Sequence, residues 1–115
     1  MAKKLARTFG CPVEFTLQVL SGKWTTVILC YLKQEPLRYG DLRRLIPTLS
    51  DKVLTARLAD LSERGLVEKK RLGGQPREVY VLTPRCKSLG VAFDELYRWG
   101  EKHAAVFGVT YQLGS

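Results

Sequence analysis

Histidine and cysteine are scarce in this sequence of 115 residues, and their scarcity bears on which sites it can form. His103 is the only histidine, and the three cysteines, Cys11, Cys30 and Cys86, include no C-x-x-C pair. A structural zinc site needs four cysteine or histidine ligands, so this composition argues against one. An odd number of widely spaced cysteines also argues against a disulfide-held scaffold. We expect no metal and no cofactor.

Acidic residues are also few, and long apolar runs are absent. The sequence has 11 aspartates and glutamates and 19 lysines and arginines, which gives a net charge of +8. A basic surface attracts polyanions such as nucleic acids. Charge alone does not exclude the alternative, a basic protein that does not bind nucleic acid. No stretch is long enough to span a membrane, and no apolar run follows the basic residues at the start. We therefore expect a cytoplasmic protein without membrane contact.

What is present is the composition of one globular domain. Hydrophobic residues make up 45% of the chain and charged residues 26%, which supplies enough apolar material for one core. We expect a flexible basic arm at 1–10, the folded domain at 11–107 and a loose tail at 108–115.

Helix and strand signals follow one another in a recognisable order. The expected elements are a helix between Cys11 and Ser21, a helix from Lys23 to Leu32, a short strand at Leu37 and Arg38, a helix from Tyr39 to Ile46, a helix from Ser50 to Arg64, strands at 66–72 and 78–82, and a last helix from Thr83 to Phe107. On the second helix, the apolar face is expected to consist of Trp24, Val27, Ile28 and Tyr31. A single hairpin must pack on helices to be stable. The order predicts a mainly α protein with a small β-hairpin, a winged helix-turn-helix.

The helix that begins after Ser50 carries the argument for DNA binding. Leu54, Leu58 and Leu61 fall on one stripe that holds it to the core. The residues expected at DNA are Ser50, Lys52, Thr55, Ala56 and Ala59. The alanines allow close approach to a groove, the lysine reaches a guanine or a phosphate, and the serine cap holds a phosphate. The alternative is an ordinary amphipathic surface helix.

The hairpin that follows is basic and has a thin tip. Cations flank Gly73 and Gly74, and such a tip can lie along or inside a minor groove. Its candidate DNA contacts are Lys70, Arg71, Gln75 and Arg77. The alternative is a solvated hairpin whose charges only prevent aggregation at its edges. Its place directly after the candidate recognition helix favours the DNA interpretation.

The last helix carries a wide apolar stripe. Its members include the residues expected at a dimer interface, Leu89, Phe93, Leu96 and Trp99. A second copy of the chain would bury this surface. The alternative is that the N-terminal helix covers the stripe within one chain, and both arrangements can coexist.

Short motifs along residues 11 to 103 resemble the HxlR-type helix-turn-helix regulators of bacteria. These motifs are Cys11-Pro12-Val13, Gly22-Lys23-Trp24, Leu37-Arg38-Tyr39-Gly40-Asp41-Leu42, Leu49-Ser50-Asp51-Lys52-Val53-Leu54-Thr55, Arg64-Gly65-Leu66-Val67 and Tyr80-Val81-Leu82-Thr83. The resemblance implies a homodimeric winged-helix protein, distantly similar to the MarR regulators. Such a protein binds a palindromic double-stranded DNA operator and represses or activates transcription.

Cys11 is the candidate redox-sensing residue. Several HxlR-type regulators use a cysteine at the matching position as a thiol switch, and a helix N-terminus favours the thiolate. The resemblance thus implies a small reactive effector, an oxidant or an electrophile. We expect Cys30 in the core and Cys86 to be a second candidate. The alternative for Cys11 is that it only starts a helix. The alternatives for the whole chain are a thiol-based redox protein and a winged helix that binds RNA or protein.

Overall fold

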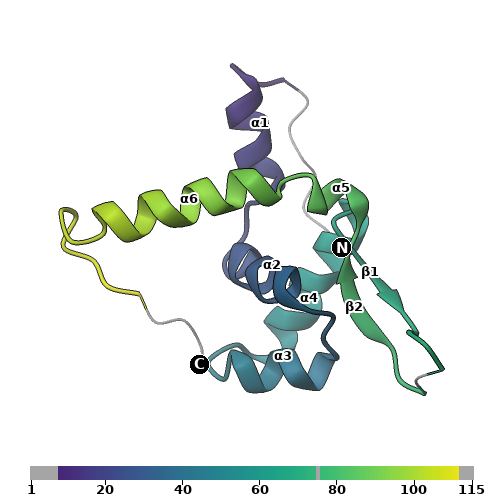
Figure 1. The fold of residues 1–115 in the computed structure, drawn as a ribbon. Helices are drawn as coiled ribbons and strands as arrows, with labels where there is room; N and C mark the ends of the chain where they lie inside the picture. Colours follow the sequence, from purple (N-terminus) through teal and green to yellow (C-terminus); the bar gives the residue numbers. More distant parts are fainter. Residues whose placement is uncertain (1–7, 75, 112–115) are drawn as a thin grey trace.

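The computed structural model describes residues 8–74 and 76–111. Its elements are α1 (Pro12–Val19), α2 (Thr25–Gln34), α3 (Tyr39–Leu45), α4 (Asp51–Glu63), β1 (Val67–Lys70), β2 (Val79–Leu82), α5 (Pro84–Lys87) and α6 (Gly90–His103). The two strands form an antiparallel hairpin in which Val67 pairs with Leu82 and Lys70 with Val79. Helices α1 and α6 extend away from the body formed by the other elements (Figure 1). The winged helix-turn-helix expected from the sequence is confirmed.

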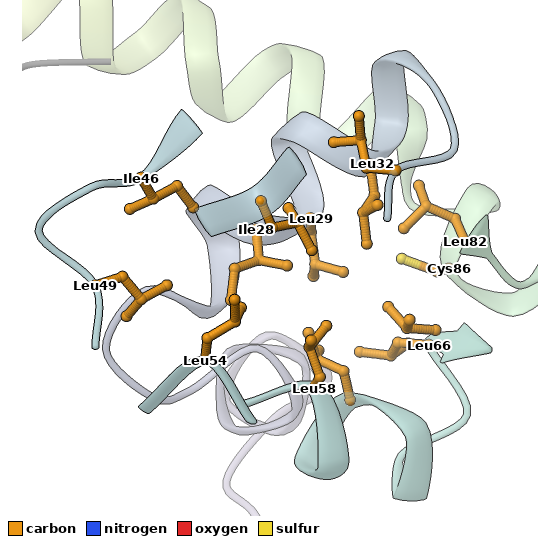
Figure 2. Packing of buried hydrophobic residues seen from close by; sticks show 14 of the residues in the cluster. Ile28, Leu29, Leu32, Ile46, Leu49, Leu54, Leu58, Leu66, Leu82 and Cys86 are labelled. Carbon is orange, nitrogen blue, oxygen red and sulfur yellow. The ribbon is translucent and has the colours of Figure 1, made fainter. Parts of the chain in front are cut away.

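The hydrophobic core lies among α2, α3, α4 and the hairpin, where leucine and isoleucine side chains point toward one another (Figure 2). Leu54 and Leu61 of α4 are fully buried and Leu58 nearly so, which confirms the predicted stripe. Burial of each such side chain contributes about 1.5–3 kcal/mol. Leu49, just before α4, is also buried, although it lies outside the helical periodicity of that segment. The stripe fixes which side of α4 faces solvent.

The buried face of α2 differs from the expected one. The helix begins at Thr25 rather than Lys23, because Trp24 has a φ of 76° and therefore lies outside the helical region. Of the four residues expected to face inward, only Ile28 is fully buried, and the other three pack at the margin of the core. The buried residues of α2 are Thr25, Ile28, Leu29 and Leu32.

The hairpin is joined to its neighbours along the outer edge of β2 and at the end opposite its tip. Leu37 and Tyr80 exchange two backbone hydrogen bonds, of 3.2 Å from Leu37 N and 2.7 Å from Tyr80 N. The short strand expected at Leu37 thus exists as an isolated bridge on the outer edge of β2. At the end of the hairpin opposite its tip, Gly65 ends α4 with a φ of 72°, and its carbonyl accepts a hydrogen bond of 2.6 Å from Thr83 Oγ1.

The sequence predicts one last helix from Thr83 to Phe107, but two separate helices occupy this segment. Thr83 caps α5, but that helix ends at Lys87, and α6 begins only at Gly90 and ends at His103. Cys86 of α5 is buried in the core, and at the break the Leu89 N–H donates to the Cys86 carbonyl, three residues back, at 2.9 Å. Ser88 Oγ also donates a hydrogen bond of 2.6 Å to the Arg85 carbonyl within the turn. Within the described part of the chain, no helix has the length and apolarity that crossing a bilayer requires.

Candidate nucleic-acid interface

The structure places the predicted reading face of α4 in solvent. Ser50 caps the helix as expected, because its Oγ accepts a hydrogen bond of 3.1 Å from the Val53 backbone. The other candidates on this face, Lys52, Thr55, Ala56 and Ala59, are all exposed. Small side chains at exposed positions leave the helix backbone accessible to a groove. Contact with DNA at these residues remains a prediction.

A polar cluster that the sequence did not indicate joins α3 to the first turns of α4. Tyr39 Oη donates a hydrogen bond of 2.9 Å to Asp51 Oδ1 and lies 3.2 Å from Thr55 Oγ1. Arg43 Nε is 2.8 Å from the same Asp51 oxygen. The hydroxyl of Thr55 therefore has a partner within the protein, although its side chain stays exposed.

Two arginines on the other side of α4 hold the turn between α1 and α2. Arg57 Nε donates a hydrogen bond of 2.9 Å to the Lys23 carbonyl. Arg64 Nη1 donates bonds of 2.7 Å to the Val19 carbonyl and 3.0 Å to the Ser21 carbonyl. These bonds span more than 30 residues of sequence, so sequence periodicity could not reveal them. They fix the orientation of α4 relative to the end of α1.

The hairpin presents its cations to solvent. Lys70, Arg71 and Arg77 are exposed, whereas Gln75 lies outside the described residues. Gly73 and Gly74 have φ angles of 45° and 75°, which favour glycine and explain the narrow tip. The hairpin projects past the helices (Figure 1), so its cations can approach a ligand without obstruction from them.

Cys11 lies where the sequence predicts, whereas Cys30 and Cys86 occupy environments other than those expected. Cys11 is exposed at the N-cap of α1. Cys30, expected in the core, lies on the exposed side of α2, because that helix turns Ile28 and Leu29 inward instead. Partial desolvation still raises the pKa of the Cys30 thiol, and the Lys33 charge opposes this shift. Cys86 is buried beside Leu82 (Figure 2), and burial raises the pKa of its thiol.

An apolar groove of about 520 Å³ separates α1 from α6. The residues expected at a dimer interface all line it: Leu89 and Phe93 are half-buried, and Leu96 and Trp99 are each 56% exposed. On the α1 side, Leu17 is 57% exposed. The N-terminal helix therefore leaves much of the stripe on α6 uncovered within one chain.

Comparisons with known proteins agree with this architecture. A family model described as HxlR-like helix-turn-helix matches residues 19–106. The uncharacterised HTH-type transcriptional regulators YdzF and YtcD of Bacillus subtilis (strain 168) are similar to this chain. YdzF is 37% identical over 98 residues, which cover 84% of this chain and 90% of YdzF. YtcD is 35% identical over 109 residues, which cover 93% of this chain and 86% of YtcD.

Solved structures give the same result. The redox regulator HypR in its reduced form superposes with a TM-score of 0.76 and 30% identity, covering 85% of this chain and 98% of HypR. The reduced form of the transcriptional regulator YodB from B. subtilis superposes with a TM-score of 0.70 and 29% identity, covering 82% of this chain and 94% of YodB. With its winged-helix fold and this match, the chain belongs to the HxlR-like helix-turn-helix family of DNA-binding transcriptional regulators and is not an enzyme.

Proposed function

We propose that this chain acts as a homodimer that binds a palindromic double-stranded DNA operator and thereby represses or activates transcription. The observation that carries the proposal is the exposed face of α4, which combines small side chains with Lys52. The basic hairpin follows this helix directly in the chain. Helix α4 enters the major groove, and the hairpin contacts the adjacent backbone or minor groove.

Each candidate residue has a distinct task in this proposal. Lys52, Ala56 and Ala59 approach base edges, and the methyl group of Thr55 contacts a thymine. Ser50 holds a phosphate beside the start of α4. The hairpin contacts come from Lys70, Arg71, Gln75 and Arg77. Phosphate contacts supply affinity that is independent of sequence, whereas base contacts supply the specificity.

Dimerisation through α6 and α1 supplies the two-fold symmetry. Leu96 and Trp99 expose apolar surface along the groove, and a second copy of the chain would cover it. A symmetric pair places two recognition helices about 34–36 Å apart, one turn of DNA. The operator must then be a palindrome with half-sites at that spacing.

The experiment that tests the proposal introduces a carboxylate on the reading face. Operators are first selected from random duplexes with the wild-type protein. Ala56→Glu should then lower operator affinity by about tenfold or more, because it opposes phosphates and blocks close approach. Thr26→Glu, which adds the same charge at an exposed position of α2, is the matched control and should bind as wild type does. Circular dichroism checks that both variants fold.

Two outcomes would contradict the proposal. If folded Ala56→Glu protein binds the operator as tightly as wild type, this face of α4 does not read DNA. If Thr26→Glu weakens binding equally, the effect comes from overall charge and not from the reading face.

A second proposed role is the sensing of oxidants or electrophiles through Cys11. The thiol is exposed at the N-cap of α1, one residue before Pro12, which lines the groove between α1 and α6. The similar protein HypR is described as a redox regulator, which supports the same role here. A modified Cys11 would shift α1, and Arg64 would pass the shift to α4 through the Val19 carbonyl.

A further inference from the structure

Two adjoining depressions lie between the start of α3 and the tip end of the hairpin. Their volumes are about 550 Å³ and 260 Å³, and Arg38, Asp41 and Arg77 line both of them. Arg44 also lines the smaller one. Of the three arginines, only Arg77 is among the DNA contacts predicted from the sequence. Arg38 and Arg44 therefore have no task in the function proposed so far.

The backbone places arginines from distant segments at the same depression. Because Leu37 and Tyr80 exchange two backbone hydrogen bonds, the chain that leads into α3 runs along the outer edge of β2 (Figure 1). Arg38 is the next residue after this bridge, and Arg77 precedes β2. The bridge thus brings the first turn of α3 to the tip end of the hairpin.

Asp41 orients Arg38, the residue just before α3, and Arg44 within α3. Its Oδ2 accepts a hydrogen bond of 2.9 Å from the Arg38 backbone and lies 3.5 Å from Arg38 Nε, and its Oδ1 pairs with Arg44 Nη2. The backbone hydrogen bond and the two guanidinium charges lower the pKa of Asp41, so its carboxylate stays ionised at neutral pH. Each guanidinium has five N–H donors, and this pairing occupies only part of them. Arg44 keeps 69% of its side chain exposed.

The remaining donors fit an anion with several acceptor oxygens. Three guanidiniums face two carboxylates, those of Asp41 and Glu78, so the smaller depression keeps a net positive charge. Guanidinium groups bind phosphate through paired hydrogen bonds. When a recognition helix lies in a major groove, the helix before it crosses the sugar–phosphate backbone. In this protein that preceding helix is α3.

We propose that Arg38, Arg44 and Arg77 together bind a backbone phosphate of duplex DNA beside the bases that α4 reads, an inference that rests on the proposed operator binding. The contact positions α4 in the groove and carries no sequence information. Arg38 and Arg44 from the helix-turn-helix and Arg77 from the hairpin contact the same phosphate. The contact therefore sets the register of both parts on the duplex.

The test compares Arg44→Ala with Arg98→Ala in duplex binding measured between about 50 and 200 mM salt. The two arginines are 69% and 68% exposed, and each pairs with a carboxylate three residues before it, but Arg98 lies on α6. Arg44→Ala should weaken binding about tenfold and reduce the slope of log affinity against log salt by about 1. The loss should be equal for operator and unrelated duplexes. Arg98→Ala should change neither quantity.

A charge-neutral double variant separates a specific contact from a general effect of charge. Asp41→Asn combined with Arg44→Ala leaves the net charge of the protein unchanged. If the guanidinium itself holds a phosphate, the double variant keeps the reduced affinity and the reduced slope. A return to wild-type affinity and slope would overturn the proposal, because it would mean that Arg44→Ala acts only by leaving the Asp41 carboxylate unpaired.

Thermal melting followed by circular dichroism checks that the variants fold. If Arg44→Ala does not fold, Arg38→Ala takes its place in the same binding measurements. If the folded variants keep the wild-type affinity and salt slope, the proposed phosphate site is overturned, but the proposal that the protein binds an operator still stands. If the wild-type protein binds no duplex at all, the proposed function fails as well, so the two failures are distinguishable.

Discussion

At the scale of single residues, the three thiols should differ in reactivity. We expect iodoacetamide to modify Cys11 fastest in the native protein, since it is exposed. Cys30 is also exposed, but its pKa is raised, so its rate should rise only at more alkaline pH. Cys86 is 1% exposed and should react at a rate limited by unfolding. Mass spectrometry of each cysteine peptide over time measures the three rates.

The control for this experiment is the denatured protein, in which the three rates should converge. Equal rates for Cys86 and Cys11 in the native protein would mean that α5 does not bury its thiol. Operator binding is followed in parallel. If modification of Cys11 leaves affinity unchanged, or if Cys11 reacts no faster than Cys30 at neutral pH, the proposed thiol switch fails and the residue only starts a helix.

At the scale of elements, α4 depends on its leucine stripe for attachment to the core. Leu54→Ala should lower the free energy of unfolding by about 2.7–5 kcal/mol, because it removes a side chain with 0% exposure and leaves a cavity. Denaturant unfolding measures the change. Lys52→Ala, two residues away on the exposed side, should alter stability by about 0.5 kcal/mol or less. A small effect of Leu54→Ala would mean that the helix is not anchored at this residue.

The elements also show where local signals suffice. Ser50 and Gly65 start and end α4 as their residue types predict, since a hydroxyl caps an N-terminus and glycine adopts a positive φ at low cost. Thr83 and Pro84 start α5 in the same way. The end of α5 was not predicted, because Ser88 and Leu89 carry no local stop signal, and the structure shows the break as a hydrogen bond from Leu89 N to the carbonyl three residues back.

At the scale of the whole molecule, the groove between α1 and α6 predicts a dimer. Leu96→Glu with Trp99→Glu should give monomers with much weaker operator binding, because two charges would be placed in an apolar interface. Sedimentation at micromolar concentration measures the oligomeric state. Tyr97→Glu is the control, since Tyr97 is 49% exposed on α6 and lines the depression beside Cys30 rather than this groove. A monomeric wild-type protein would contradict the proposed assembly.

The sequence by itself determined the order of elements and which face of α4 is exposed. Leu54, Leu58 and Leu61 repeat at helical spacing, so the exposed side that carries Lys52 and Ala56 follows from a periodicity of 3.6 residues. Caps and glycine turns are equally local, and they placed the hairpin correctly. A combination of several short motifs identified the family.

Only the tertiary structure decided what depends on contacts between distant residues. In the middle of α2, residues 27–32 form an unbroken apolar run, so the sequence could not decide whether Cys30 or Leu29 faces the core, and packing in the core decided it. The hydrogen bonds from Arg57 and Arg64 to the turn after α1 join residues 34 to 45 positions apart. Arg38 and Arg77 share a depression only because Leu37 pairs with β2. Long-range pairing of this kind leaves no periodic trace in a single sequence.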